Sequence, residues 1–366
     1  MIINLNKKEF RDVVGIVSRF ADKRSSTLPT LSGIALIAGD EGIKVRATNL
    51  ETGVDMFVEG TIKTPGAIVI PSSVLRDISS SFSDSGQVTI EHSGDTAIIT
   101  AGTAKSTVKT LPFDDFPSLP LPENPKTTFR IPGASLVSLI NTVASCASTS
   151  TIRPELAAVL LSSEGGQVKA VATDSFRLAE KKISIKEKMN NFSILIPARN
   201  ALDLAQTIPD TDVEVRVDEH QCAVVWGKNT LTTRLVAAAY PDYTQIIPKS
   251  FTSEATVLRK DFEGALKRTA VFSDSFQKVR LGFDVKGKKL ALSAHNADVG
   301  EAVEPLASSL TGDSLELSFN FRYLQTPLPL FTSESITLSA GGIGRPLVIK
   351  GVGDQSFLYL VMPMNQ

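Results

Sequence analysis

One pair of residues has the spacing of a catalytic nucleophile and its partner. Ser275 and Lys278 match the Ser-x-x-Lys motif of serine acyl enzymes, in which the serine is the nucleophile. The companion motifs of those enzymes, Ser-Asp-Asn and Lys-Thr-Gly, are absent from the sequence. An acyl-transferring enzyme is therefore an alternative hypothesis, and reaction of Ser275 with an acylating probe would test it.

The other residues that could do chemistry have simpler interpretations. Asp174 and Arg177 could be an acid and its orienting partner, but their spacing also fits a turn aspartate with a neighbouring ion pair. The three histidines, His92, His220 and His295, fall at separate turns or strand ends. Phosphate-loop, His-Glu-x-x-His and Cys-x-x-Cys motifs are absent. We expect a protein that is not an enzyme and that has no metal site and no cofactor.

The elements that carry these residues repeat three times. Thr48, Thr173 and His295 each end the second strand of a predicted hairpin, in Ala-Thr-Asn, Ala-Thr-Asp and Ala-His-Asn. The period is about 120 residues, which is the size of a whole domain rather than of a solenoid unit. Three such repeats account for the 366 residues.

Each repeat also has apolar residues at helical spacing. Asn6 precedes the first helix and stands three residues before Glu9, the spacing of a capping box. Pro327 and Pro329 interrupt the last helix, which should be short or displaced. The predicted apolar stripes are Phe10, Val13, Val14, Val17; Leu136, Leu139, Ile140, Val143; and Phe262, Ala265, Leu266, Thr269.

These patterns predict an α+β fold of three repeated domains, each made of β-sheets with two helices. The expected domain ranges are 1–122, 127–246 and 253–366, separated by polar linkers that contain proline.

Composition agrees with an ordinary globular protein. Apolar residues make up 42% of the chain, charged residues 21%, and the net charge is −1. No apolar run approaches 18 residues, and the first residues do not resemble a signal peptide. Cys146 and Cys222 are too few for a disulfide framework, so we expect buried free thiols in a cytoplasmic protein.

Four motifs, in this order and spacing, resemble the family of bacterial sliding clamps, the β subunit of the replicative DNA polymerase III. They are Thr-Leu-Pro-Thr-Leu-Ser-Gly at 27–33, Ala-Thr-Asp-Ser-Phe-Arg-Leu-Ala at 172–179, Tyr-Pro-Asp-Tyr at 240–243 and Val-Met-Pro-Met at 361–364. The resemblance covers the whole chain. It implies a head-to-tail homodimer that forms a six-domain ring around duplex DNA at the replication fork and confers processivity without sequence specificity.

The resemblance also implies a pocket between the second and third domains for short hydrophobic peptides of polymerases and the clamp loader. Methionine suits a site that accepts several related peptides, because its side chain adapts. Leu156, Leu178 and Leu360 have the alternative of being simple core residues. The implied pocket residues are Leu156, Thr173, Ser175, Phe176, Arg177, Leu178, Pro241, Ile246, Phe276, Asn320, Tyr323, Leu360, Val361, Met362, Pro363 and Met364.

Some residues near this pocket depart from the family pattern. Ser175, Phe176, Gln245 and the final pair Asn365 and Gln366 could change peptide preference. Asp12 is acidic where members of the family can carry a basic residue, which reduces the expected share of the first helix in DNA binding.

Basic residues are expected to face DNA in the ring, because duplex DNA carries about one negative charge per 1.7 Å of its axis. The candidates are Arg24, Arg153, Arg199, Lys267 and Arg322, each with the alternative of being an ordinary surface charge. A scaffold that never encircles DNA is a further alternative. It predicts no basic bias on the outward faces of the helices, whereas the first and fifth expected helices carry Lys7, Lys8, Arg11, Lys260, Lys267 and Arg268.

The family resemblance implies a dimer contact between the first domain of one copy and the third domain of the other. The edge strand 105–109 would lie against Val271 and Phe272, with Val108 in the apolar centre. Lys105 could meet Glu301 or Glu304 across the contact.

Overall fold

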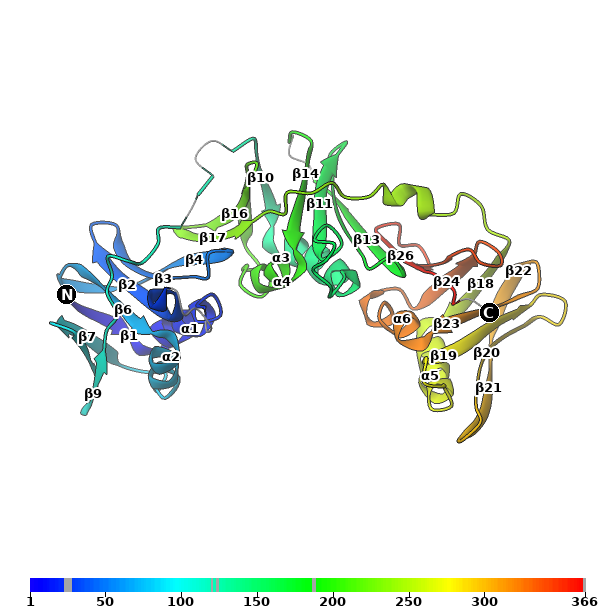
Figure 1. Cartoon of the computed structure of the whole chain (residues 1–366), viewed down its shortest axis with the longest axis horizontal. Coiled ribbons are helices and arrows are strands. Elements are labelled where there is room, and N and C mark those ends of the chain that lie inside the picture. Colours follow the sequence, from blue (N-terminus) through cyan, green and yellow to red (C-terminus); the bar gives the residue numbers. More distant parts are fainter. Residues whose placement is uncertain (23–27, 120, 123–124, 186–188, 365–366) are drawn as a thin grey trace. The chain divides into compact units, whose positions relative to one another are not determined.

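The computed structural model describes residues 1–22, 28–119, 121–122, 125–185 and 189–364 (Figure 1). The chain divides into two compact units. The first contains Met1–Leu136, Glu187–Asn190 and Asp203–Leu235, and the second contains Val137–Lys186, Asn191–Leu202 and Val236–Gln366. Helices α3 (Gly133–Val143) and α4 (Ala198–Ala205) each run from one unit into the other. Each unit is described by itself.

The first unit contains two antiparallel sheets. The five-stranded sheet has the order β5-β1-β7-β8-β9, and the eight-stranded sheet has the order β10-β15-β16-β17-β4-β3-β2-β6. The elements of this unit are β1 (Ile2–Asn6), α1 (Lys7–Val17), η1 (Pro29–Ser32), β2 (Gly33–Gly39), β3 (Gly42–Thr48), β4 (Thr52–Val58), β5 (Gly60–Thr64), β6 (Gly66–Pro71), α2 (Ser72–Ser80), β7 (Gln87–Ser93), β8 (Thr96–Ala101), β9 (Ala104–Lys109), β10 (Thr127–Pro132), β15 (Asp212–Val217), β16 (Gln221–Trp226) and β17 (Asn229–Arg234).

The second unit also contains two antiparallel sheets. The nine-stranded sheet has the order β14-β11-β12-β13-β26-β25-β24-β18-β22, and the four-stranded sheet has the order β21-β20-β19-β23. Its elements are η2 (Ala144–Cys146), β11 (Ala158–Glu164), β12 (Gln167–Thr173), β13 (Arg177–Ser184), β14 (Phe192–Pro197), η3 (Tyr243–Ile246), β18 (Ser253–Leu258), α5 (Arg259–Ala270), β19 (Lys278–Asp284), β20 (Lys289–Asn296), β21 (Gly300–Leu306), β22 (Ser308–Gly312), β23 (Leu315–Asn320), α6 (Phe321–Gln325), η4 (Leu328–Leu330), β24 (Ser335–Ala340), β25 (Leu347–Gly351) and β26 (Phe357–Val361).

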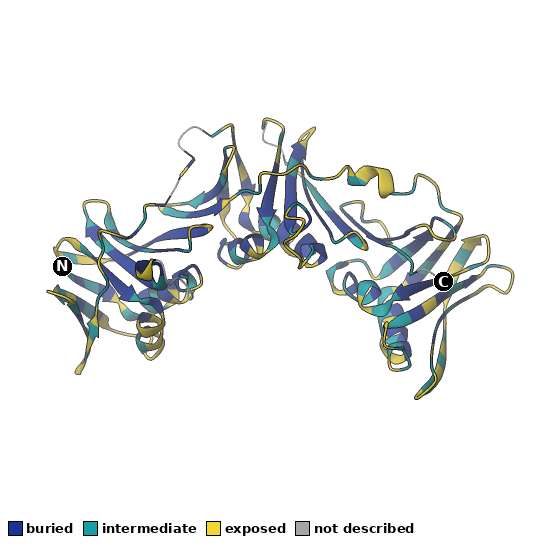
Figure 2. Cartoon of the chain, viewed as in Figure 1, coloured by how far each residue is buried: buried dark blue, intermediate teal, exposed yellow. Residues whose placement is uncertain are grey.

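The helices bury the apolar stripes that the sequence predicted. All twelve residues of the three stripes are buried, and Figure 2 shows buried residues on the inner sides of helices and sheets. The α+β prediction is confirmed, with six α-helices in the described ranges. The last helix, α6, is short as predicted, because Pro327 and Pro329 follow its end at Gln325.

Half of the predicted capping box forms at the start of α1. The Asn6 side chain accepts a hydrogen bond from the backbone N–H of Glu9, at 3.1 Å. The Glu9 carboxylate accepts instead from the backbone N–H of Glu59, at 2.9 Å, so it does not complete the reciprocal bond.

Both cysteines are buried free thiols, as predicted. Burial raises the pKa of Cys146 to about 11 and that of Cys222 to about 12. Both side chains therefore stay protonated at neutral pH.

Sheets run without interruption through the expected boundaries between repeats. In the first unit β4, from the first repeat, pairs with β17, from the second. In the second unit β13, from the second repeat, pairs with β26, from the third, and Arg177 stands opposite Val361. The β13–β26 pair brings the 173–177 turn next to the chain segment that follows β26.

Candidate peptide pocket

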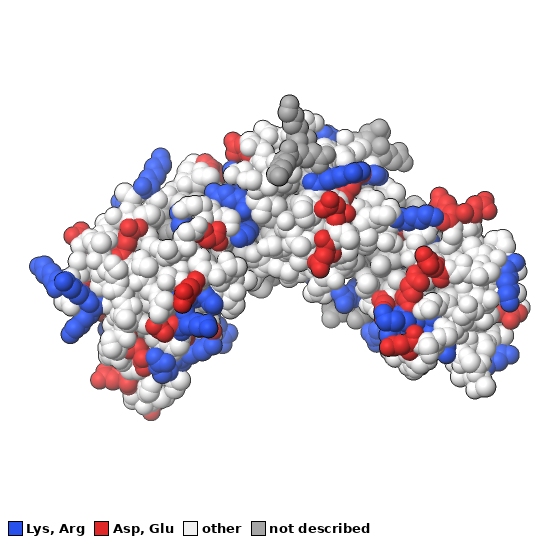
Figure 3. All heavy atoms as spheres, turned by 180° about the vertical axis from the view of Figure 1, so that it is seen from behind, with Lys and Arg blue, Asp and Glu red and all other residues white. Residues whose placement is uncertain are grey.

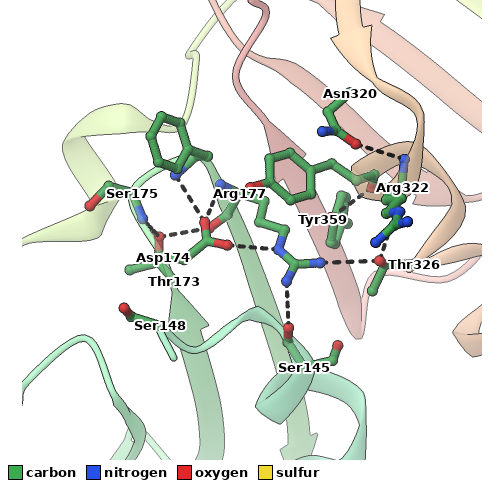
Figure 4. Close-up of polar contacts among 12 residues, drawn as sticks. Ser145, Ser148, Thr173, Asp174, Ser175, Arg177, Asn320, Arg322, Thr326 and Tyr359 are labelled. Atoms are coloured by element: carbon green, nitrogen blue, oxygen red, sulfur yellow. Dashed lines mark hydrogen bonds and ion pairs between the residues drawn. The ribbon is translucent and has the colours of Figure 1, made fainter. Parts of the chain in front are cut away.

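A five-residue turn connects β12 to β13. The Thr173 hydroxyl donates to the carbonyl of Arg177 at 2.7 Å and accepts from the N–H of Ser175 at 3.1 Å. One carboxylate oxygen of Asp174 accepts from the N–H groups of Phe176 and Arg177, both at 3.0 Å (Figure 4). Ser175 has a φ of 77°, in the left-handed region that costs a non-glycine residue energy. The hydrogen bonds hold this turn in a strained conformation.

The same turn occurs at the corresponding place of the first repeat. Thr48 hydrogen-bonds to the backbone of Thr52 and Leu50 at 2.8 and 3.0 Å, and Leu50 has a φ of 71°. Asn49 takes the place of Asp174 and accepts from the N–H groups of Glu51 and Thr52. The repeat predicted from sequence therefore extends to individual hydrogen bonds.

Arg177 joins the turn to two other segments of the second unit. Its guanidinium donates to Asp174 at 2.9 Å, to the carbonyl of Ser145 at 2.8 Å and to the hydroxyl of Thr326 at 3.1 Å (Figure 4). The guanidinium also lies over the ring of Tyr323. Burial is the largest single influence and opposes the charge, but the hydrogen bond to Asp174 and the electrostatic attraction of Tyr359, Cys146 and Asp174 together outweigh it and raise the pKa of Arg177. Asp174 is thus a turn residue with an ion pair, the simpler of the two interpretations.

A pocket of about 470 Å³ lies beside this network. The segment after β26 forms one wall: the N–H of Met362 donates to the carbonyl of Phe176 at 2.8 Å, and that of Met364 donates to Ser318 at 2.7 Å. The backbone of Tyr323 is fixed by a hydrogen bond, because the Tyr359 hydroxyl donates to the Tyr323 carbonyl at 2.7 Å. The lining residues are Ser175, Phe176, Asn320, Tyr323, Met362, Pro363 and Met364.

All seven lining residues belong to the set that the family resemblance implied, and the other members of that set take different places. Thr173 and Arg177 support the wall through the hydrogen bonds above. Leu178 and Leu360 belong to a buried apolar cluster, and Leu156 and Val361 are also buried, so these four act as core. Pro241, Ile246 and Phe276 are exposed and do not line the pocket, and the last two are 45% and 70% exposed.

Sequence reasoning missed the partners of Arg177. Ser145 contributes only a backbone carbonyl, which any residue offers, and so has no sequence signal. Thr326 stands four residues after Arg322, and its hydroxyl donates to the Arg322 carbonyl at 2.8 Å. The four-residue spacing between Arg322 and Thr326 on the short helix α6 is the one sequence feature that could have drawn attention to Thr326.

Two of the five candidate DNA-binding cations already have carboxylate partners. Arg153 pairs with Glu155 at 2.9 Å, and Lys267 pairs with Glu263 at 2.7 Å. Arg199 and Arg322 are exposed and have no ion pair within the part of the chain that the structure describes. Arg24 lies outside the described residues. Figure 3 shows basic and acidic side chains intermixed on one face of the molecule.

Arg199 also lines a second pocket of about 650 Å³ in the second unit. Leu202 and Val236 contribute to its apolar surface, and Ser148 and Thr151 contribute hydroxyl groups. The pocket therefore combines an apolar surface with one exposed cation.

The Ser-x-x-Lys motif lies in a turn that a neighbouring aspartate closes. The Asp274 carboxylate accepts hydrogen bonds from the N–H groups of Phe276 and Lys278, which closes the turn before β19. Ser275 is exposed in that turn. Across the described ranges, no three or more His, Cys, Asp and Glu side chains gather in a way that could hold a metal ion. No helix found there is long and apolar enough to span a membrane.

Comparison with known proteins assigns the whole chain to one family. Residues 1–120, 130–242 and 244–365 match, respectively, the N-terminal, central and C-terminal domains of the DNA polymerase III beta subunit. The chain belongs to the DNA polymerase III beta subunit family. Members of this family are non-catalytic processivity clamps of DNA replication, and the chain has that role.

Individual relatives agree with this assignment along their full length. The beta sliding clamp of Synechococcus elongatus is 28% identical, with 98% of each chain covered. The crystal structure of a DnaN sliding clamp from Pseudomonas aeruginosa bound to griselimycin superposes with a TM-score of 0.94 at 25% identity, covering both chains completely. The DNA polymerase sliding clamp of Bacillus subtilis gives the same TM-score and identity, covering 100% of this chain and 99% of that one. The predicted clamp fold and function are confirmed.

Proposed function

We propose that two copies of this chain close head to tail into a ring around duplex DNA, and that the 470 Å³ pocket tethers partner proteins to it. The observation that carries the proposal is the end-to-end correspondence with sliding clamps, in sequence and in fold. The three domains would span 1–122, 127–246 and 253–366, and the protein would act in the bacterial cytoplasm.

The edges of two sheets support the dimer. β9 ends one sheet and β21 ends another, so each has an unpaired edge among the described strands. Unpaired edges of this kind are templates for a further strand. Val271 and Val303 are 65% and 67% exposed in the second unit, and Phe272 lies beside Gly300 of β21. Val303 was not among the sequence candidates.

Ion pairs within the third repeat indicate which glutamate is available to Lys105. Arg268 donates two hydrogen bonds to Glu304, at 3.0 and 2.8 Å, which lowers the pKa of that carboxylate. Glu301 is nearest to His295, at 3.8 Å. We therefore expect Lys105 to meet Glu301 of the second copy, while Val108 contributes to the apolar centre.

The DNA contacts would come from Arg199 and Arg322 more than from Arg153 and Lys267. A cation without a carboxylate partner can bind a phosphate without first breaking an ion pair. Such contacts are sequence-independent and weaken as salt rises. Sliding requires weak contacts of this kind.

The pocket suits a short hydrophobic peptide from a polymerase subunit or a clamp loader. Phe176, Tyr323, Met362 and Met364 provide aromatic and thioether surface, and Asn320 adds a polar group. Such a mixture accepts apolar side chains and fixes their orientation.

Binding of a fluorescein-labelled hexapeptide that carries a leucine and a phenylalanine tests the pocket. The full chain is compared with a variant that lacks residues 362–366. Saturable binding that disappears on truncation is the expected result. Absence of binding by the folded full chain would overturn the peptide proposal and leave the ring to be tested by retention of the protein on circular but not linear DNA.

A further inference from the structure

The nine-stranded sheet buries one carboxylate in an apolar face. Glu180 is 6% exposed on β13, two residues after Leu178 and therefore on the same face of the strand. Leu358, its cross-strand partner on β26, belongs to the same buried cluster as Leu178 and Leu360. A buried carboxylate is costly unless it is hydrogen-bonded, so the partners of Glu180 matter.

One of these partners comes from the segment 236–251, which we call the strap. The Tyr243 hydroxyl donates to Oε2 of Glu180 at 2.6 Å, and Nζ of Lys182 lies 3.1 Å from Oε1. Burial, together with the Glu180 carboxylate, raises the pKa of Tyr243 above its usual value, so the hydroxyl keeps the proton it donates. The contact is short and charge-assisted.

The strap covers the apolar face across the β13–β26 junction. Its half-buried residues recur every three or four positions and pack against the cluster that contains Leu178 and Leu360. In Figure 1 the strap is the yellow-green segment that runs past β13 and β26. The packed strap residues are Val236, Tyr240, Tyr243, Ile247 and Phe251.

The strap and the peptide pocket share this cluster. Met362 lines the pocket and packs against the same buried cluster as Tyr240 and Tyr243. Its backbone N–H is bonded to Phe176, on the opposite wall. A shift of the strap over the cluster would therefore change the support under Met362.

We propose that Tyr243 is a positioning residue for the peptide pocket: its hydrogen bond to Glu180 fixes the strap over the β13–β26 junction and so holds Met362 in place. The proposal rests on the peptide-binding function proposed above. Tyr243 need not touch the peptide.

Tyr240 provides a matched control on the same strap. Its hydroxyl is buried, but it has no hydrogen-bond partner of normal geometry in the described part of the chain. Tyr240→Phe and Tyr243→Phe each remove one buried hydroxyl, but only the second removes a hydrogen bond of normal geometry. Glu180→Gln is the conservative variant, since its amide oxygen can still accept from Tyr243.

The experiment measures the affinity of the labelled hexapeptide and the hydrogen exchange of the Met362 amide in each variant. Tyr243→Phe should weaken binding at least about threefold and speed exchange at Met362, whereas Tyr240→Phe should stay near wild type. Glu180→Gln should fall between them, because it keeps an acceptor for Tyr243 but loses the charge that strengthens the bond. Wild-type affinity and exchange in folded Tyr243→Phe would overturn the proposal. If the wild type binds no peptide, the pocket function fails, and exchange at Met362 alone decides whether Tyr243 holds this wall.

Discussion

The guanidinium carbon of Arg177 lies 4.7 Å from the ring centre of Tyr323. Arg177 comes from β13 and Tyr323 from α6, so one cation connects elements of the second and third repeats. Its planar fork also bonds to Asp174, Ser145 and Thr326. The wall of the pocket thus depends on a single side chain with several directed contacts.

We expect Arg177→Lys to weaken peptide binding and to lower the free energy of unfolding by about 1–3 kcal/mol. Lysine keeps the charge but cannot make the forked contacts. Urea unfolding and peptide titration measure both effects. Arg216→Lys is the control, because Arg216 makes a more exposed pair with Glu214 and should change stability by less than about 0.5 kcal/mol. Equal effects of the two substitutions would contradict the special role of Arg177.

The repeated turn offers a second matched pair. Thr173→Val and Thr48→Val each remove a buried hydroxyl that donates one hydrogen bond and accepts another. Each should cost about 1–3 kcal/mol of stability. Only Thr173→Val should also reduce peptide affinity, because only its turn lines the pocket. An equal loss of affinity in both variants would mean that the effect is general destabilisation.

For the dimer, Val271→Asp combined with Phe272→Asp should yield monomers in light scattering. The substitutions put charge into the proposed apolar contact. Val303→Asp should weaken the dimer in the same way. Ile343→Asp changes a residue that is 76% exposed in the turn between β24 and β25 and should leave the dimer intact. A double variant that remains dimeric would refute the proposed contact.

Measurements of DNA binding should distinguish a basic residue with no described carboxylate partner from one that already has an ion pair. Arg199→Ala should lower affinity for duplex DNA and reduce the slope of log K against log salt by about 0.9, the value for one phosphate contact. Lys267→Ala should have a smaller effect, because Lys267 is already paired with Glu263. The measurement is a salt titration with a closed circular duplex. A larger effect of Lys267→Ala would reverse the assignment.

The buried thiols predict a pH dependence. Because burial raises the pKa of Cys146 from 9.0 to about 11, the folded state favours the thiol over the thiolate. The contribution of Cys146 to the free energy of unfolding is fully present below about pH 9. It falls by about 1.4 kcal/mol per pH unit as the pH rises toward 11. Cys222 should act in the same direction. Iodoacetamide at pH 8 should alkylate both residues slowly in the folded protein and rapidly in urea; rapid reaction of the folded protein would contradict their burial.

Periodic features of the chain were predictable from sequence. The apolar stripes follow the helical period, and the position of the 173–177 turn follows from its likeness to the turn at Thr48. The short α6 follows from the chemistry of Pro327, which cannot continue a helix.

Contacts between distant residues were not predictable in this way. Tyr243 and Glu180 are 63 positions apart, and nothing in either local pattern identifies the other as its partner. The pairing of Arg268 with Glu304 depends on how α5 lies against β21. Such contacts depend on how distant elements pack together, and that packing leaves no repeating pattern in the sequence.

If two copies form the proposed ring, the continuous sheets predict where that ring should open. Each junction within a chain is closed by backbone pairing, and the β13–β26 junction is also crossed by the covalent strap. No covalent link crosses a seam between two copies. A clamp loader that opens the proposed ring would therefore separate the two copies at that seam, where no strand pairing within a chain has to break.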